Sequence, residues 1–453
     1  MKGETVILSE LNCQQYKNSK EEGRIADHDD DMDSEDEKEL SRLKKAILLI
    51  ILYFTNIAIG MAYVILTPFF SVLAKNKGVH PYEISIIFAM YPFTKFFLSI
   101  IVGILLPRIG IKTAIWIGLV LDGGSLIIFG MLDQIIDRNI FVIFCIITRA
   151  LQGVGAAFYL TAGVVFIISI QKNAIASSVG LSEFSLSLGM ILGPIIGGVL
   201  YQYRGFKAPF LAIGILLIII SFAVIKFPSI YPLGFGQAQS FRTTMEILTI
   251  PRVMVLYIAM TLINTYIGYL EPSIAFHLKP FHLSESEIGA VFGAFPLTYM
   301  MFTIIVGYVT DKMGKYRWIN ICGMIICGIA YQFLGPAPYL KMHQSLVMTV
   351  TSLAFLGLGA ASSLVATYPD MVEVLVAREY VSTDDKFVIY SISSGLLTCA
   401  FSLGQIIGMA VGGSIALRSS ANFNLSSCII GFLGIAHAIV MILLTLSEKF
   451  RTV

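Results

Sequence analysis

The chain has 453 residues, of which 56% are hydrophobic and only 13% charged. Its mean hydropathy of +0.81 excludes a soluble globular protein, because a chain of this length could not keep so much apolar surface away from water. The formal net charge of +2 hides a segregated distribution: residues 21–39 alone hold eleven Asp or Glu side chains. Nothing in this balance points to a nucleic-acid partner, and the expected surroundings are a lipid bilayer.

Residues 1–43 are polar and strongly acidic, which predicts a disordered cytosolic tail. The first apolar run starts near Ala46, after this charged stretch and not at residue 1. We therefore expect it to act as an uncleaved signal anchor, with no cleavable signal peptide before it.

Twelve hydrophobic segments follow the tail, each long enough to cross a bilayer about 30 Å thick. The longest break, residues 228–249, predicts a cytosolic linker between a first half at 44–227 and a second half at 250–447, with a cytosolic tail at 448–453. The segments lie near residues 44–72, 82–106, 112–132, 139–169, 175–202, 208–227, 250–277, 286–310, 317–337, 344–367, 387–416 and 425–447.

An even number of crossings puts both termini on one side of the membrane. With the termini inside, the inner loops and flanks hold 17 Lys or Arg residues and the outer loops hold eight. Because positive residues accumulate in cytoplasmic loops, this bias predicts that both ends lie in the cytosol.

An internal repeat joins the two halves. Shifted by 204 residues, Glu83 falls on Glu287, the run at 101–103 falls on 305–307, and the run at 153–157 falls on 357–361. At a shift of 215 residues, four glycines of the fifth segment fall on four glycines of the eleventh. The eleven-residue difference places an insertion near residues 370–386.

Two similar six-helix halves are typical of secondary transporters, whose substrate site lies near the bilayer midplane between the repeats. A receptor or a membrane enzyme gives no reason for such a duplication. The expected fold is therefore an all-α membrane protein of twelve helices arranged as two six-helix repeats.

The loop from Gly307 to Arg317 (GYVTDKMGKYR) resembles the signature of the major facilitator superfamily between helices two and three, here in its second-half copy. The resemblance assigns Asp311 and Arg317 to ion pairing or gating. The first-half copy from Gly103 to Lys112 carries Pro107 where the signature has aspartate, which argues against the family's charge-relay latch in that half.

Further motifs narrow the resemblance. Residues 149–155 (RALQGVG) resemble the superfamily's fourth-helix motif, and residues 189–198 (GMILGPIIGG) resemble its fifth-helix antiporter motif. Residues 200–210, 270–272 and 390–413 are similar to the vesicular amine transporter family, and most similar to its branch with the vesicular polyamine transporter.

Two departures separate the chain from the monoamine and acetylcholine branches: its first helix has Asn56 but no acidic residue, and Thr398 stands where those carriers have aspartate. What the resemblance implies is proton-coupled export of an organic cation, such as a polyamine, into an acidic vesicle. It implies a monomer in a secretory, synaptic-type or lysosome-related membrane.

Four charged residues lie inside the predicted helices of the first half, and their formal charges sum to zero. An ionised side chain at a helix centre costs about 2.5 to 3.5 kcal/mol, so such residues normally pair or line a wet cavity. We expect ion-pair or gating roles, with Arg149 pairing with Glu183 because their helices follow each other, and Glu183 is also a candidate proton site. The four residues are Lys95, Asp122, Arg149 and Glu183.

Glu271 has no Lys or Arg in its own half of the helix and precedes Pro272, which interrupts the helical hydrogen bonds. Two interpretations stay open: it binds a proton or an amine, or it caps a loop near the outer face. Asn264 and Tyr266 are expected to line the same cavity, where tyrosine faces could hold an ammonium group. Tyr159, Tyr269 and Tyr368 are on helices expected to line it as well.

Two ladders of glycines spaced by four residues predict helix faces on which a neighbouring backbone comes close. They comprise Gly189, Gly193 and Gly197, and Gly404, Gly408 and Gly412. Pro194 is expected to kink the first-half copy. Asp370 and Glu373 follow the tenth segment, where they would be solvated loop charges or, alternatively, would steer cations toward the cavity.

We expect no metal site, cofactor or enzymatic activity, because the sequence offers no metal-spaced His or Cys cluster and no catalytic array. Two alternative functions remain: a plasma-membrane exporter of drugs or organic anions, and a transport-dead receptor or scaffold.

Overall fold

The computed structural model describes residues 44–171, 174–225, 241–377, 386–414 and 420–451. The acidic tail, residues 226–227 of the predicted first half and residues 228–240 of the predicted linker lie outside the described residues. From Leu52 onward the chain forms one unit, and the contacts given below lie within it.

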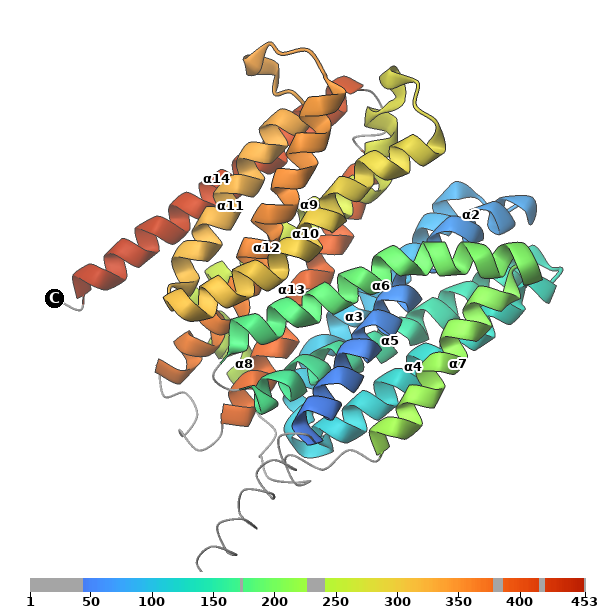
Figure 1. Ribbon diagram of the computed structural model, residues 1–453, viewed down its shortest axis with the longest axis horizontal. Helices are drawn as coiled ribbons and strands as arrows, with labels where there is room; N and C mark the ends of the chain where they lie inside the picture. Colours follow the sequence, from blue (N-terminus) through green and yellow to red (C-terminus); the bar gives the residue numbers. More distant parts are fainter. Residues whose placement is uncertain (1–43, 172–173, 226–240, 378–385, 415–419, 452–453) are drawn as a thin grey trace, which may run out of the picture. The chain divides into compact units, whose positions relative to one another are not determined.

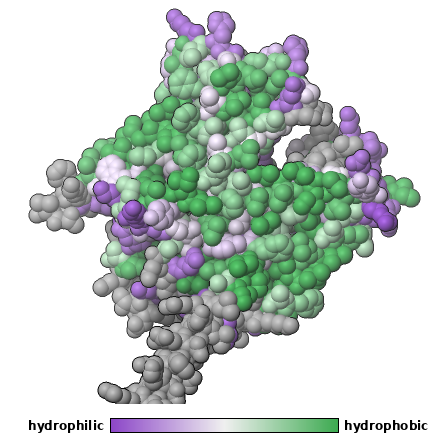
Figure 2. Space-filling model, viewed as in Figure 1, coloured by the Kyte–Doolittle hydropathy of each residue, from purple (hydrophilic) through white to green (hydrophobic). Residues whose placement is uncertain are grey.

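The described residues contain twelve helices that are long and apolar enough to cross a membrane, which confirms the predicted twelve spans. Figure 2 shows hydrophobic side chains along the flanks of the helices, with hydrophilic side chains gathered toward their ends. The spans are Lys44–Val64, Tyr82–Ile109, Ile111–Gln134, Arg138–Ile170, Ile175–Arg204, Lys207–Ile225, Pro251–Ile274, Glu287–Met313, Tyr316–Leu334, Leu346–Ala377, Lys386–Gly412 and Phe423–Glu448.

The helices of the first half follow the span Lys44–Val64 in chain order (Figure 1). The predicted first segment, 44–72, divides into that span and the short helix α2, which has a proline in its first turn. Proline lacks the amide hydrogen that a helix interior needs but suits its first turn. The elements are α2 (Thr67–Asn76), α3 (Pro81–Ile109), α4 (Ile111–Met131), α5 (Arg138–Ile170), α6 (Ile175–Arg204) and α7 (Lys207–Ile225).

The second half begins with a short helix within the predicted linker and continues with six long helices. Its fifth element, α12, runs ten residues beyond the predicted end at 367 and passes through Pro369. The elements are α8 (Phe241–Leu248), α9 (Pro251–His277), α10 (Glu285–Met313), α11 (Tyr316–Leu334), α12 (Leu346–Ala377), α13 (Lys386–Ser414) and α14 (Ser420–Arg451).

The repeat fixes equivalent helix boundaries in the two halves. At the start of α3, Glu83 accepts a 2.8 Å hydrogen bond from the amide of His80, and at the start of α10 its repeat mate Glu287 accepts the same bond from Ser284. Each carboxylate thus satisfies an amide that the helix leaves unpaired and favours the positive end of the helix dipole.

Both predicted glycine ladders lie against a neighbouring backbone. A Cβ atom on Gly189 of α6 would stand 2.0 Å from the carbonyl oxygen of Ile57, and one on Gly404 of α13 would stand 2.2 Å from that of Thr261 in α9. Hydrogen is the only side chain that fits. The first span therefore packs on α6, and α9 packs on α13, at backbone contact distance.

The same close packing carries a prediction about stability. Gly189→Ala forces the first span away from α6, and we expect it to lose at least about 2 kcal/mol of stability, the cost typical of overpacking. Gly198→Ala is a matched control on the same helix, because no atom lies within 4 Å of its Cβ position. Thermal unfolding in detergent measures the stability of both variants. Equal melting temperatures for Gly189→Ala and Gly198→Ala would contradict the packing argument.

At the end of the second half opposite the linker, His277 joins several elements. Its ring stacks on Phe423 with centroids 4.0 Å apart, and the side-chain amide of Gln344 lies 3.0 Å from its Nε2. The ring also forms a hydrogen bond with the backbone of Leu334. Burial lowers the pKa of His277 from 6.5 to about 4, so the folded protein holds the ring neutral.

Because the unfolded chain binds this proton more readily, the His277 contribution to stability is present above pH 6.5 and is lost as the pH falls toward 4. The full change is about 3 kcal/mol. We expect His277→Phe to flatten the stability profile between these pH values. His343 is exposed and precedes Gln344 in the chain, so His343→Gln is the control. An unchanged stability profile for His277→Phe would show that His277 does not cause this pH dependence.

Candidate functional site

A polar cluster within the membrane spans joins the two halves. Lys95 of α3 points its Nζ to within 3.4 Å of the Oε1 of Gln405 in α13, and lies 4.5 Å from the centre of the Phe401 ring. Gln405 in turn donates a 2.9 Å hydrogen bond to the hydroxyl of Tyr63 in the first span. One amide therefore links three helices across the interface, and the buried ammonium is held by an oxygen and an aromatic face.

Arg149 occupies the first-half side of this cluster. Its Nη1 donates to the Oε1 of Gln152, one turn along α5, and its guanidinium lies 5.0 Å from the centre of the Tyr91 ring. Asp122 of α4 interacts electrostatically with Arg149 and forms a hydrogen bond with Gln152. Two of the four charged residues predicted for the first half, Asp122 and Arg149, thus lie close together and share the amide of Gln152.

The order of the helices led us to expect a pair between Glu183 and Arg149. The structure instead gives Glu183 another partner. Its Oε2 accepts a 2.9 Å hydrogen bond from the hydroxyl of Tyr299 in α10, across the interface between the halves. It also interacts electrostatically with Lys95. Adjacency in the chain does not decide the partner. The position of a side chain around its helix does, and here α6 presents Glu183 to α10.

Glu271 lies on α9, and its side chain is exposed although the residue lies within a membrane span. It interacts electrostatically with Tyr63, the same residue that receives the bond from Gln405. No salt bridge to Glu271 forms among the described residues. The cluster therefore has an acidic, accessible edge contributed by the second half.

Asn264 and Tyr266 are buried in the helix packing of the second half. Asn264 is fully buried and donates to the carbonyl of Met260 in its own helix. The ring of Tyr266 packs on Tyr331 of α11 with centroids 4.8 Å apart. Three other tyrosines expected near the cavity are also buried in helix packing, namely Tyr159, Tyr269 and Tyr368.

The halves also meet at the linker end, which we define as the end of the helices where Ile225 and Phe241 stand. Here Asp311 of α10 accepts hydrogen bonds from the amides of Ala176 and Ser177, at 3.0 and 2.7 Å. These are free amides in the first turn of α6, so a carboxylate of the second half caps a helix of the first.

Glycine contacts extend this interface in both repeats. A Cβ on Gly180 of α6 would stand 2.3 Å from the carbonyl of Thr303 in α10, and a Cβ on Gly103 of α3 would stand 3.0 Å from the Cα of Gly395 in α13. The two contacts involve repeat mates, Gly103 with Gly307 and Gly180 with Gly395. Only the α6–α10 contact carries the additional Asp311 cap among the described residues.

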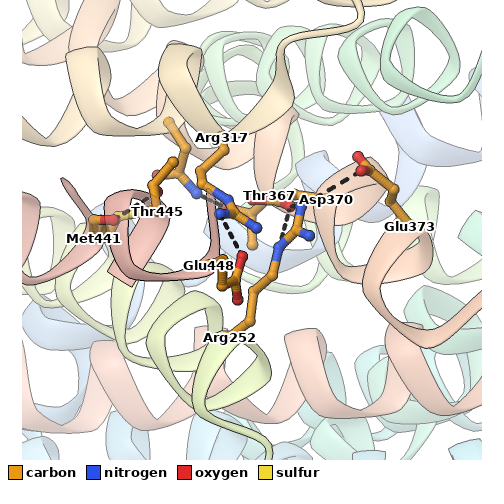
Figure 3. Close-up of polar contacts among 9 residues, drawn as sticks. Arg252, Arg317, Thr367, Asp370, Glu373, Met441, Thr445 and Glu448 are labelled. Carbon is orange, nitrogen blue, oxygen red and sulfur yellow. Dashed lines mark hydrogen bonds and ion pairs between the residues drawn. The ribbon is translucent and has the colours of Figure 1, made fainter. Parts of the chain in front are cut away.

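A second charge group lies at the linker end of the second half (Figure 3). The Nε of Arg252 in α9 donates a 3.0 Å bond to Asp370 of α12, and Glu373 lies 3.7 Å from the same guanidinium. Nearby, Arg317 of α11 pairs with Glu448 of α14 at 2.7 Å. Asp370 is fully buried, so its interpretation as a solvated loop charge was wrong, because α12 continues past Pro369 and carries the carboxylate under α9.

Sequence reasoning missed the polar, uncharged members of the cluster that joins the two halves. Gln405, Gln152, Tyr91 and Tyr299 were not singled out, although each is a polar residue inside a predicted span. They could have been identified from the sequence, because burying an uncharged amide or hydroxyl in lipid without a partner also costs free energy. Among the described residues no group of His, Cys, Asp or Glu could hold a metal ion.

The Arg252–Asp370 pair gives a prediction for folding. Asp370→Asn leaves a largely buried guanidinium without its main counter-charge, and loss of one partner from such a pair costs about 3 to 5 kcal/mol. Glu373→Gln is the matched control, since its side chain is 52% exposed and surface pairs contribute at most about 1 kcal/mol. Thermal unfolding in detergent separates the two, and similar losses would show that the buried contact does not stabilise this end.

The sequence profile described as Major Facilitator Superfamily matches residues 52–277 and again residues 247–452. The chain is 30% identical over 412 residues to the MFS-type transporter SLC18B1 of Rattus norvegicus, covering 90% of this chain and 88% of that protein. It is 25% identical over 363 residues to the human synaptic vesicular amine transporter, covering 79% and 65% of the two chains.

A solved structure shares the fold. The crystal structure of the major facilitator transporter FucP in the outward conformation superposes with a TM-score of 0.65, covering 88% of this chain and 99% of that one. Only 11% of the aligned residues are identical, so this likeness concerns the arrangement of helices alone.

Proposed function

Since the chain belongs to the Major Facilitator Superfamily, and so is a multi-pass membrane transporter of small molecules and not an enzyme, we propose that it exchanges protons for an organic cation. The cation is a polyamine or another amine, loaded into an acidic vesicle. Both termini then lie in the cytosol, and the transporter works as a monomer.

The exposed carboxylate of Glu271 is the observation that carries this proposal. It lies within a membrane span, beside the cluster that joins the halves, and among the described residues it forms no salt bridge. An ionisable residue in a span is costly unless it binds a counter-charge or faces water. An ammonium group entering from the accessible side would supply that counter-charge.

The balance of charge in the cluster favours a cation over an anion. Lys95 and Arg149 are offset by Asp122 and Glu183, so these four residues together with Glu271 carry one net negative charge. Aromatic rings stand beside the site as well: Tyr63 and Tyr91 have centroids 5.2 Å apart. Tyrosine faces and a carboxylate together suit the binding of an alkylammonium group.

Proton coupling follows from the same residue. A carboxylate that is accessible in one state and enclosed in the other differs in its affinity for protons between the two states. A proton and an ammonium group would then compete for Glu271, which gives exchange. The named function of the synaptic vesicular amine transporter supports an amine as the cargo and a vesicle as the compartment.

Uptake into proteoliposomes tests the proposal. We expect the purified protein to accumulate labelled spermidine, or another labelled amine, when the lumen is made acidic, and to show little uptake without the pH gradient. Gradient-independent uptake, or no uptake of any amine, would overturn proton-coupled amine exchange. Gradient-independent transport of organic anions would favour the exporter alternative, and inactivity toward all solutes would favour a receptor or scaffold.

Glu271→Gln removes the charge at nearly constant volume, so we expect a loss of gradient-driven uptake of about 10- to 100-fold, the scale of a lost charge-assisted contact. Glu246→Gln is the control, since this residue of α8 lies on the exposed pair with Arg242, and its uptake should equal that of the unmodified protein. Wild-type uptake by a correctly folded Glu271→Gln variant would remove Glu271 from the site.

A further inference from the structure

The geometry points to Tyr299 as a positioning residue: we infer that its hydrogen bond to Glu183 is a proton-sensitive clasp that holds α6 against α10 and closes the linker end. This role deepens the proposed function, because it assigns the proton that triggers opening to Glu183, whereas the cargo binds beside Glu271. The repeat mate of Glu183 is Thr398 and that of Tyr299 is Lys95, so the equivalent half-interface lacks this carboxylate–hydroxyl pair.

The contact joins a buried tyrosine to a half-buried carboxylate. Tyr299 is 6% exposed, and its hydroxyl donates to Glu183 at 2.9 Å, while its ring stacks on Phe295 one turn earlier with centroids 6.2 Å apart. The charged and titratable groups that face Glu183 are Tyr299 from α10 and Lys95 from α3. The carboxylate thus lies between a hydroxyl donor and an ammonium group from two different helices.

The proton sensitivity follows from the chemistry of these partners. An ionised carboxylate accepts a charge-assisted hydrogen bond, which is roughly twice as strong as one between neutral groups. It also attracts the Lys95 ammonium. When Glu183 takes up a proton, the bond to Tyr299 becomes a neutral one and the attraction to Lys95 disappears. Both changes weaken the hold of α6 on α10.

The clasp stands at one end of a continuous interface that runs toward the linker end. One turn on from Glu183, Gly180 meets the backbone of Thr303. Beyond it, Ala176, Val306 and Val365 form a buried apolar cluster, after which Asp311 caps α6. Apart from the Asp311 cap, this interface relies on apolar and backbone contacts, so the ionised Glu183 is its main charge-dependent attachment toward the membrane centre.

This arrangement gives the exchange cycle an order. With Glu183 ionised, the interface is closed at the linker end and cargo at Glu271 is exposed on the other side. A proton arriving from that side neutralises Glu183, loosens α6 from α10 and lets the linker end open. Loss of the proton to the neutral compartment restores the clasp. The proton that drives the return step thus binds at Glu183, apart from the proton that competes with the cargo at Glu271.

Thiol labelling of one buried position measures the opening directly. Val306 is 8% exposed within the closed interface, so Val306→Cys in an otherwise cysteine-free chain reacts with a maleimide when α6 and α10 separate. In detergent, we expect the labelling rate, after correction for thiol ionisation with a free peptide, to rise about tenfold between about pH 7.5 and about pH 5.5.

Tyr299→Phe keeps the stacked ring and removes one oxygen. We expect it to raise labelling at about pH 7.5 by about tenfold and to reduce the pH dependence. Glu183→Gln should label rapidly at every pH, because it cannot ionise. Tyr308→Phe, at an exposed tyrosine of the same helix, is the matched control and should keep the unmodified pH profile.

Failure of this inference can be told apart from failure of the proposed function. If Tyr299→Phe and Glu183→Gln keep the unmodified labelling profile, the clasp is refuted whatever the cargo is. Glu271→Gln should lose amine uptake but keep the pH-dependent labelling of position 306. If instead Glu271→Gln abolishes that pH dependence while Glu183→Gln preserves it, the triggering proton belongs to Glu271, and the assignment to Glu183 is overturned.

Discussion

The cost of charge inside a bilayer is the constraint on which the centre of this structure depends. Lys95 and Arg149 are buried within membrane spans, where an isolated ionised side chain would destabilise the fold. The chain meets this cost with amide oxygens from Gln405 and Gln152, with aromatic faces and with nearby carboxylates. Because Gln405 and Glu183 reach their partners across the interface between the halves, the same contacts that make the charges tolerable also link the two repeats.

The two repeats share their backbone features but differ in the side chains proposed to function in transport. Backbone features recur in both halves: the acidic caps at Glu83 and Glu287, and the interface glycines at Gly103 and Gly307. Side-chain chemistry does not recur. Glu271 corresponds to Thr67, and the Asp311 cap corresponds to Pro107. A transporter that alternates between two states needs two similar halves to rock against each other, but its coupling depends on charges that differ between them.

The ion pairs at the linker end have another role. Arg252 with Asp370, and Arg317 with Glu448, connect α9 to α12 and α11 to α14 within the second half (Figure 3). They join helices within the second half, whereas the Asp311 cap and the Glu183–Tyr299 bond join helices of different halves. Rigid halves and a breakable interface are what a rocking motion requires.

The sequence by itself determined the twelve spans, the close-packed glycine faces and the membrane charges, because hydropathy, four-residue spacing and the cost of burying charge are local properties. Only the tertiary structure decided the partners. Glu183 meets Tyr299 instead of Arg149, Asp370 is buried under α9, and Tyr266 packs inside its own half. Such pairings depend on the rotation of each helix about its axis and on which helices become neighbours. Neither quantity is encoded in any single segment, so they emerge only when all the helices pack together.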